Sequence, residues 1–242
     1  MRVAVLNDVH GNLSALDAVL AEVPKDATIV VGGDIAGGPL AAEAIERLQG
    51  LRGRVHFIRG NADRVGDDLP DDDLSQRRIE WQQRHLSDET RRFLERLPLT
   101  ETLDVAGVGP TLFCHGSPRS ESEIVTAVTS DERLREILAP VEEQTVVCGH
   151  THHQFDRTVA GTRIVNAGSV GMPYEGRPGA YWALLGPEVE FRRTEYDLEA
   201  TSEAIRASGY PEPDELIELL TKPPSAQEAA EYFEQQALAA AT

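Results

Sequence analysis

The chain has few of the residues that mark several protein classes. It contains only two cysteines, Cys114 and Cys148, so a scaffold held by several disulfides is excluded. Both lie in apolar runs, where a small buried thiol is the expected state. No stretch approaches the roughly 20 consecutive apolar residues of a membrane-spanning helix. Only one basic residue, Arg2, precedes the first strand-like run, so no secretory signal is expected. We therefore expect a cytoplasmic protein with no membrane partner.

Positive charge is also scarce. The 242 residues include 23 Lys and Arg but 41 Asp and Glu, which gives a formal net charge of −18. A surface with this charge repels polyanions, so general binding to nucleic acid is not expected. A chain of this length can bury a sizeable core and fits one large domain or two small ones.

The first part of the chain alternates between strand-like and helix-like patterns. Apolar runs within 2–10, 27–34 and 54–63 each end in polar residues, and helical spacing of apolar residues fills 12–23 and about 39–50. This β-α-β-α-β order predicts parallel strands with helices packed against them.

The remaining segments add helices and hairpins to this frame. Residues 64–100 are polar and predict two helices, around Trp81 and Phe93, that form an insertion or cap on a single domain spanning 1–242. The second half predicts hairpins and helices over about 121–142. A helical tail is expected from about 197, with helices near 198–208, 213–221 and 225–240. Ser225 and Glu228 have the spacing of a capping box for the last of these helices.

Short polar clusters follow five of the apolar runs, at 7–12, 32–34, 59–63, 114–116 and 148–153. Each cluster offers a carboxylate, an imidazole or an amide oxygen. Sites in open α/β sheets form at the carboxyl ends of strands, where these clusters would meet. Taken singly, each cluster is typical of a turn or of an isolated histidine. The five together favour a metal centre.

In this order, the clusters resemble the pattern DxH, GD, GN, H and GHxH of the calcineurin-like metallophosphoesterases. The resemblance runs from Val3 to about Gly171, and `DVHGN` and `RGNAD` are most similar to the small YfcE-like phosphodiesterase branch. It implies an α/β fold: a four-layer α/β/β/α sandwich of two mixed β-sheets flanked by helices. A dimetal site would lie at the carboxyl ends of the strands.

The resemblance also implies a set of ligands. One metal is assigned to Asp8, His10 and His152, the other to Asn61, His115 and His150, and Asp34 bridges both. Catalytic roles are assigned to Asp34, Asn61, Asp63 and His115. A mixed nitrogen and oxygen donor set suits two divalent transition-metal ions, with manganese the first choice and iron, zinc or nickel as alternatives.

The implied reaction is hydrolysis of a small phosphate ester, favouring phosphodiesters, through in-line attack by a metal-bridging hydroxide. Ala62 stands where the protein-phosphatase branch carries a proton-donating histidine. This counts against the alternative of a phosphomonoesterase or a protein or nucleotide phosphatase on the same fold. An alternative of another class is a non-catalytic metal-binding scaffold for protein interaction. Such proteins usually lose ligands, whereas all seven positions are filled here.

Other residues receive weaker assignments. Arg59 and Arg64 are candidate phosphate contacts, and Asn12 is either a substrate contact or the N-cap of the first helix. Asp63 has no imidazole partner at position 62 and is expected to orient the metal ligands without binding a metal itself. Among the other histidines, we expect His56 to be packed at its strand, His85 exposed, and His153 turned away from His152 or supporting it. A homo-oligomer is compatible with the sequence.

Overall fold

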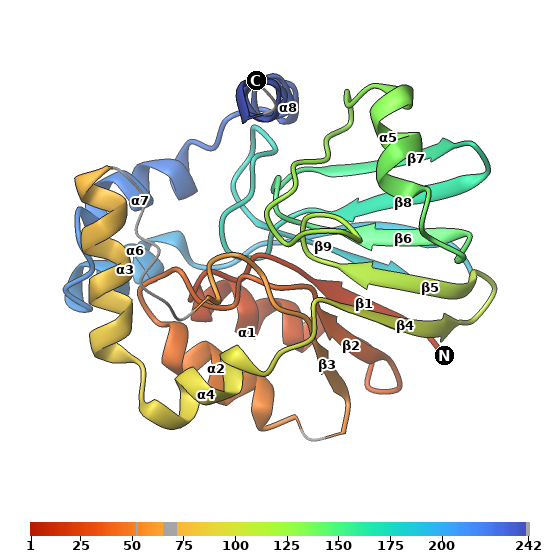
Figure 1. The fold of residues 1–242 in the computed structure, drawn as a ribbon. Helices are drawn as coiled ribbons and strands as arrows, with labels where there is room; N and C mark the ends of the chain where they lie inside the picture. The colour runs from red at the N-terminus through yellow and green to blue at the C-terminus, as the bar shows by residue number, and fades with distance from the viewer. Residues whose placement is uncertain (52, 65–71, 241–242) are drawn as a thin grey trace.

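Two five-stranded sheets form the centre of the molecule (Figure 1). The computed structural model describes residues 1–51, 53–64 and 72–240. In the first sheet the strand order is β10-β9-β1-β2-β3, and in the second it is β4-β5-β6-β8-β7. The first sheet contains β1 (Val3–Leu6), β2 (Thr28–Val31), β3 (Val55–Phe57), β9 (Ala180–Leu185) and β10 (Val189–Thr194). The second contains β4 (Thr100–Val105), β5 (Gly109–Cys114), β6 (Thr145–Cys148), β7 (Gln154–Val159) and β8 (Thr162–Ala167).

Both sheets are mixed. Strands β1, β2 and β3 run parallel in the first sheet, and β5, β6 and β8 run parallel in the second. The outer strands β10, β4 and β7 pair antiparallel with their neighbours, and β9 is antiparallel to both β1 and β10. The parallel strands of a sheet therefore end at the same edge, where the five polar clusters follow them.

Alternating side chains divide the core into layers. Val5 and Val30 of the first sheet meet Val147 and Val165 of the second in an apolar layer between the sheets. Residues of the opposite alternation, such as Leu6, face helices α1 (Leu13–Glu22) and α2 (Ala41–Gln49) on the outside of the first sheet. Helix α5 (Asp131–Leu138) covers the outside of the second sheet. The four-layer α/β/β/α sandwich is thus confirmed.

The insertion and the tail lie side by side although they are far apart in the sequence (Figure 1). The insertion contains α3 (Asp73–His85) and α4 (Asp88–Glu95), and the tail contains α6 (Leu198–Ala207), α7 (Pro213–Thr221) and α8 (Ala226–Ala240). Trp81 of α3 packs against an apolar cluster that includes Ile205 and Tyr210. Residues 65–71, at the start of the expected insertion, lie outside the described residues.

Most helix predictions agree with the structure, with one correction. Helices over about 121–142 were expected, but the only helix there runs over Asp131–Leu138. The hydroxyl of Thr129 accepts a hydrogen bond from the backbone N–H of Thr126 (2.8 Å), and such local bonds compete with a helix. Pro140 lies just beyond the helix and has no backbone N–H to continue its hydrogen bonds. None of the helices described is long and apolar enough to cross a membrane.

Candidate metal centre

The structure brings the seven candidate ligands together from both sheets. Metal-binding atoms of Asp8, His10, Asp34 and His152 all lie within 4.8 Å of one another, and the same holds for Asp34, His115 and His150. Asn61 joins the second group, because its Oδ1 lies 3.2 Å from the Nε2 of His115. The two groups share Asp34. This is the arrangement that the sequence resemblance implies for two metals, and the ligand roles themselves remain a prediction.

Five of the candidate ligands have an unusual backbone conformation. Seven of the described non-glycine residues have positive φ, and five of them are candidate ligands: Asp8, His10, Asp34, His150 and His152, with φ between 44° and 67°. Such a conformation costs a non-glycine residue about 1–3 kcal/mol and persists only where the surroundings enforce it. These angles turn the chain sharply in the loops that follow β1, β2 and β6, and the five side chains meet in the two groups described above.

Two glycines allow the loops to approach one another closely. A Cβ atom at Gly60 would lie 2.1 Å from Oδ1 of Asp34, and one at Gly33 would lie 2.5 Å from Nδ1 of His115. Any larger residue would displace a candidate ligand. Gly33 also has a φ of +97°, which favours glycine independently.

Hydrogen bonds between the two sheets fix the relative position of the loops. The Nδ2 of Asn7, after β1, donates to the carbonyl of Cys148 at the end of β6 (2.7 Å). The backbone N–H of His150 donates to Oδ2 of Asp8 (3.1 Å). Because both donors are buried or partly buried, these bonds exclude water and favour one register of the two sheets.

The protonation of two imidazoles follows from their partners. Nδ1 of His152 lies 2.7 Å from the carbonyl of Met172, and Nδ1 of His115 lies 2.8 Å from that of Gly32. A carbonyl only accepts, so each Nδ1 carries a hydrogen, and Nε2 is the atom of each ring that is left to bind a proton or a metal. A backbone carbonyl behind the ring is a common support for metal-binding histidines.

These Nε2 atoms face other acceptors. Nε2 of His152 lies 3.2 Å from Nε2 of His10 and 3.2 Å from Oδ1 of Asp8, an oxygen for which the described residues supply no hydrogen-bond donor. Nε2 of His115 likewise lies 3.3 Å from Oδ2 of Asp34. Converging acceptors repel one another unless a proton on a ring or a metal cation lies between them. The residues therefore fit the metals that the resemblance implies.

The pKa values of the buried groups also indicate a site that attracts a cation. Burial by itself raises the pKa of the Asp34 carboxyl, but the neighbouring His115 outweighs it and holds that pKa well below its usual range. Burial likewise lowers the pKa of His115, but Asp34 and Asp8 outweigh it and raise that pKa to about 10. Burial and the adjacent His115 lower the pKa of His150 to about 4. The centre thus holds two carboxylates in a space that attracts a cation.

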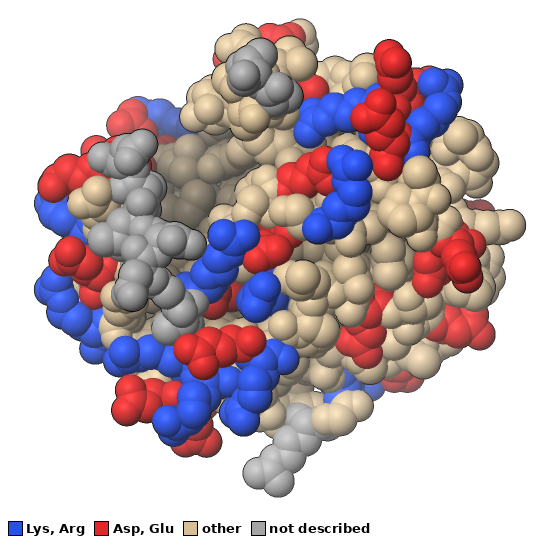
Figure 2. All heavy atoms as spheres, viewed as in Figure 1, with Lys and Arg blue, Asp and Glu red and all other residues tan. Residues whose placement is uncertain are grey.

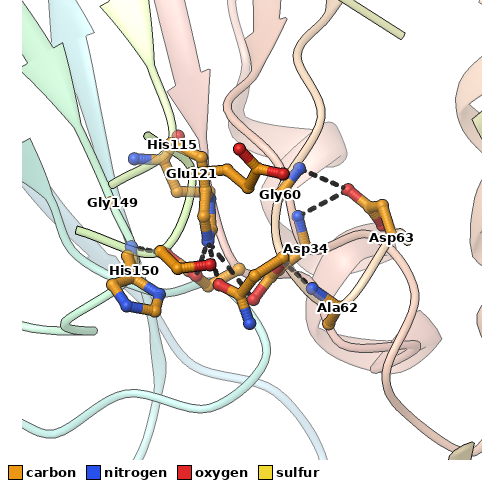
Figure 3. A network of polar contacts seen from close by, with 12 residues as sticks. Asp34, Gly60, Ala62, Asp63, His115, Glu121, Gly149 and His150 are labelled. Carbon is orange, nitrogen blue, oxygen red and sulfur yellow. Dashed lines mark hydrogen bonds and ion pairs between the residues drawn. The ribbon is translucent and has the colours of Figure 1, made fainter. Parts of the chain in front are cut away.

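Asp63 lies directly behind the ligand loops of the first sheet. Its fully buried carboxylate accepts hydrogen bonds from the backbone N–H groups of Asp34 (2.8 Å), Ala36 (2.9 Å) and Gly60 (2.9 Å), as Figure 3 shows in part. Burial and the charge of Asp34 raise the pKa of this carboxyl to about 7. Asp63 therefore ties the loops after β2 and β3 together, and its supporting position agrees with the sequence. A catalytic role for it remains a prediction.

The three candidate substrate contacts are engaged within the protein. Asn12 caps α1, since its Oδ1 accepts from the N–H of Ala15 (3.1 Å), which confirms the capping alternative. Arg59 and Arg64 both donate to the carboxylate of Glu121, at 3.4 Å and 2.8 Å. Figure 3 shows Glu121 beside Gly60 and His115. We call these three charged residues the arginine cluster, which carries one net positive charge. No local motif marks Glu121 as part of the site, because Arg59 and Arg64 lie about sixty residues away in the sequence.

The remaining histidines have structural roles. His153 is buried, its Nδ1 donates to the carbonyl of Thr151 (2.8 Å), and its Nε2 lies 3.4 Å from the N–H of Ala127. It therefore supports the loop that carries His152. His56 pairs with Glu101 (2.6 Å) at the edge strand β3, and His85 is exposed and stacks on Trp81, as expected.

Comparison with known proteins supports the pattern of residues. The model of the calcineurin-like phosphoesterase superfamily domain matches residues 1–186. An uncharacterised protein of Methanocaldococcus jannaschii is 26% identical over 242 residues, covering 87% of this chain and 94% of the relative. The crystal structure of a metallophosphoesterase from Sphaerobacter thermophilus is 28% identical, with a TM-score of 0.74 and coverage of 91% of this chain and 98% of that one. A hypothetical protein from Pyrococcus horikoshii OT3 is 25% identical, with a TM-score of 0.80 and the same coverage.

Proposed function

Because the chain belongs to the calcineurin-like phosphoesterase superfamily, we propose that it is a two-metal hydrolase of phosphate esters, with phosphodiesters as its preferred substrates. One observation carries the proposal: seven side chains with nitrogen or oxygen ligand atoms converge from both sheets in one largely buried site. A scaffold without catalysis has no need to retain the whole set.

Each metal would be held by three residues of its own and by the shared Asp34. Asp8, His10 and His152 would hold one ion, and Asn61, His115 and His150 the other. When bound there, two divalent ions would supply a more acidic water as the nucleophile and would neutralise charge on the phosphoryl oxygens. Manganese is our first choice for both positions, since the donor set has no thiolate.

The surrounding residues would orient the ligands and the substrate. The Nδ1 hydrogens of His115 and His152 hold both rings with Nε2 directed into the site, and Asp63 holds the loop of Asp34. The arginine cluster lies beside Asn61, where a guanidinium can bind a phosphate oxygen. Glu121 would keep Arg59 and Arg64 in place until substrate arrives.

The preference for diesters rests on position 62. Ala62 presents only a methyl group, while its N–H donates to Oδ1 of Asp34 (2.7 Å) and its carbonyl accepts from Gln82 (3.2 Å). An imidazole at this position is the proton donor expected of a protein phosphatase, and the methyl group of Ala62 has no proton to donate. This supports a diesterase over the alternative phosphatase.

The test is a comparison of matched substrates with one leaving group. Protein reconstituted with manganese, iron, zinc or nickel is assayed with bis(p-nitrophenyl) phosphate and with p-nitrophenyl phosphate. We expect metal-dependent activity and a higher kcat/KM for the diester. A higher value for the monoester would favour the phosphatase. Two bound metals without hydrolysis of either ester would favour the non-catalytic scaffold.

A further inference from the structure

The C-terminal helix α8 lies beside the candidate metal centre. The ring of Phe233 on α8 is 6.3 Å from that of His150 and 6.1 Å from that of Tyr174, with the Tyr174 and Phe233 planes within 29° of each other. Tyr174 in turn stacks on His152 at 4.8 Å. We call Tyr174 and Phe233 the aromatic wall. It contacts one imidazole from each of the two proposed metal positions. Phe233 lies beyond residues 1–186, the part of the chain that the family shares.

A carboxylate next to Phe233 fixes the rotation of α8. Glu234 accepts a hydrogen bond from Oγ1 of Thr126 (2.8 Å), contacts Oγ1 of Thr129 and pairs with Arg133 (3.4 Å). The start of α8 is fixed as well, because Ser225 and Glu228 form the expected capping box. These contacts hold Phe233 on the side of the helix that faces His150.

The segment that binds Glu234 is also bonded to the ligand loop. Thr151, between His150 and His152, donates through its hydroxyl to the carbonyl of Val125 (3.0 Å). The N–H of Ala127 lies 3.4 Å from Nε2 of His153. Residues 125–129 therefore connect α8 to the histidine ligands, and the aromatic wall keeps a defined position relative to the centre.

The hollow beneath α8 has few charged side chains on its visible walls (Figure 2). Figure 2 shows these walls as mostly tan, with Lys and Arg at the rim of the hollow. The cationic contacts for a phosphate come from the arginine cluster, beside Asn61. The two borders of the site thus differ: the arginine cluster suits an anion, and the aromatic wall suits an uncharged ring.

Resting on the proposed phosphoesterase activity, we propose that the aromatic wall selects phosphate esters whose ester group is a planar aromatic ring, such as an aryl or nucleoside group. The phosphoryl group lies at the metals, and the ring stacks on Phe233. An aromatic pair of this kind changes affinity by about tenfold at most beyond the burial of its area. Phe233 is then a specificity-determining residue.

Binding of two phosphonates, which are not hydrolysed, separates this effect from catalysis. Phenylphosphonate and methylphosphonate are titrated calorimetrically into manganese-loaded protein. Wild type should bind the phenyl compound about tenfold more tightly. Phe233→Ala and Phe233→Leu should reduce this ratio to about twofold or less. Manganese content is measured on each variant, and the ratio is compared only between preparations that hold the same amount of metal. Leu238→Ala, which removes an exposed apolar side chain of the same helix, and Phe233→Trp should preserve the ratio.

The outcomes distinguish the inference from the proposed function. If wild type binds both phosphonates equally, or if Phe233→Leu keeps the tenfold preference, the aromatic wall only packs and the inference is wrong. Phosphonate binding in either case continues to support the phosphoesterase. If neither compound binds to protein that holds manganese, the proposed function itself fails, and the inference fails with it.

Discussion

The two sheets contribute different chemistry to the candidate centre. The first sheet supplies the oxygen donors Asp8, Asp34 and Asn61 and a single imidazole, His10, whereas the second supplies imidazoles only. Neither sheet alone presents a complete set for one metal. The centre therefore exists only where the sheets pack against each other, and packing of the apolar layer between them brings the carboxylates to the imidazoles.

The two sheets also hold their loops by different means. Behind the first sheet, the buried anion Asp63 accepts three backbone N–H groups. Behind the second, the neutral and equally buried Asn166 donates to the carbonyl of Gly149 (2.7 Å) and accepts from the N–H of Gly168 (2.9 Å). The first arrangement rests on charge and the second on an amide that needs both a donor and an acceptor. Substitutions in the two sheets should therefore differ in size.

The largest effect is expected at the shared ligand. Asp34→Asn removes the charge that both metal positions use, so kcat should fall by at least about 10³-fold and manganese content should fall with it. Elemental analysis and steady-state kinetics measure the two quantities on one preparation. Asp17→Asn on α1 is the matched control, because Asp17 is a solvent-accessible aspartate that pairs with Arg47 of α2. Two retained metals with normal turnover would show that Asp34 is not the shared ligand.

A smaller effect is expected when the support of the first sheet is changed. Asp63→Asn keeps the shape of the side chain but turns an NH2 group toward backbone N–H donors. We expect manganese affinity to fall by about 10–100-fold. The free energy of unfolding should fall by about 2–3 kcal/mol. Competition with a chelator and chemical denaturation measure these changes. Unchanged affinity would mean that the loops after β2 and β3 do not need the anion.

The corresponding change in the second sheet should cost less. Asn166→Ala removes neutral hydrogen bonds, which are worth about 1 kcal/mol each, so manganese affinity should fall by less than about tenfold. Asn166→Asp should be worse than Ala, because a carboxylate oxygen would face the carbonyl of Gly149. The same assays apply. Equal losses for Asn166→Ala and Asp63→Asn would contradict the proposed difference between the sheets.

The smallest effect is expected at the arginine cluster. The side chain of Arg64 is 49% exposed, so solvent screens its charge. Arg64→Gln should raise KM for a diester by about two- to fivefold and leave kcat unchanged. Arg47→Gln on α2, which is equally exposed and remote from the loops of the centre, is the control. A fall in kcat without a change in KM would place Arg64 at the reacting group instead.

The strands and the ligand clusters could be predicted from the sequence because their signals are local. An apolar run followed by polar residues marks both the end of a strand and the edge at which its neighbours end. The family resemblance assigned ligand roles among the polar residues that follow these runs, and the structure places Asp34 with His10 in one group and with His150 in the other. The capping box at Ser225 is local in the same sense and was confirmed.

The borders of the centre could not be predicted, because they depend on contacts between remote segments. Nothing in the residues around Phe233 indicates that its helix reaches His150, and nothing around Glu121 indicates two arginines from another loop. The helices expected over about 121–142 show a further limit, because only Asp131–Leu138 is helical. Side-chain hydrogen bonds of Thr126 and Thr129 decide the local conformation there, and Glu234 from the tail completes them.

The left-handed backbone conformation at five candidate ligands lowers the stability of the metal-free chain, while their side chains are needed for the proposed activity. Glycine adopts these angles without strain, so a ligand replaced by glycine would relieve the backbone and also remove repulsion between buried acceptors. Selection of the metal-free chain for heat resistance should then enrich glycine at Asp8, His10, Asp34, His150 or His152 and yield stable, inactive proteins. Selection in the presence of manganese would reverse the preference, because bound metal stabilises only chains that keep their ligands.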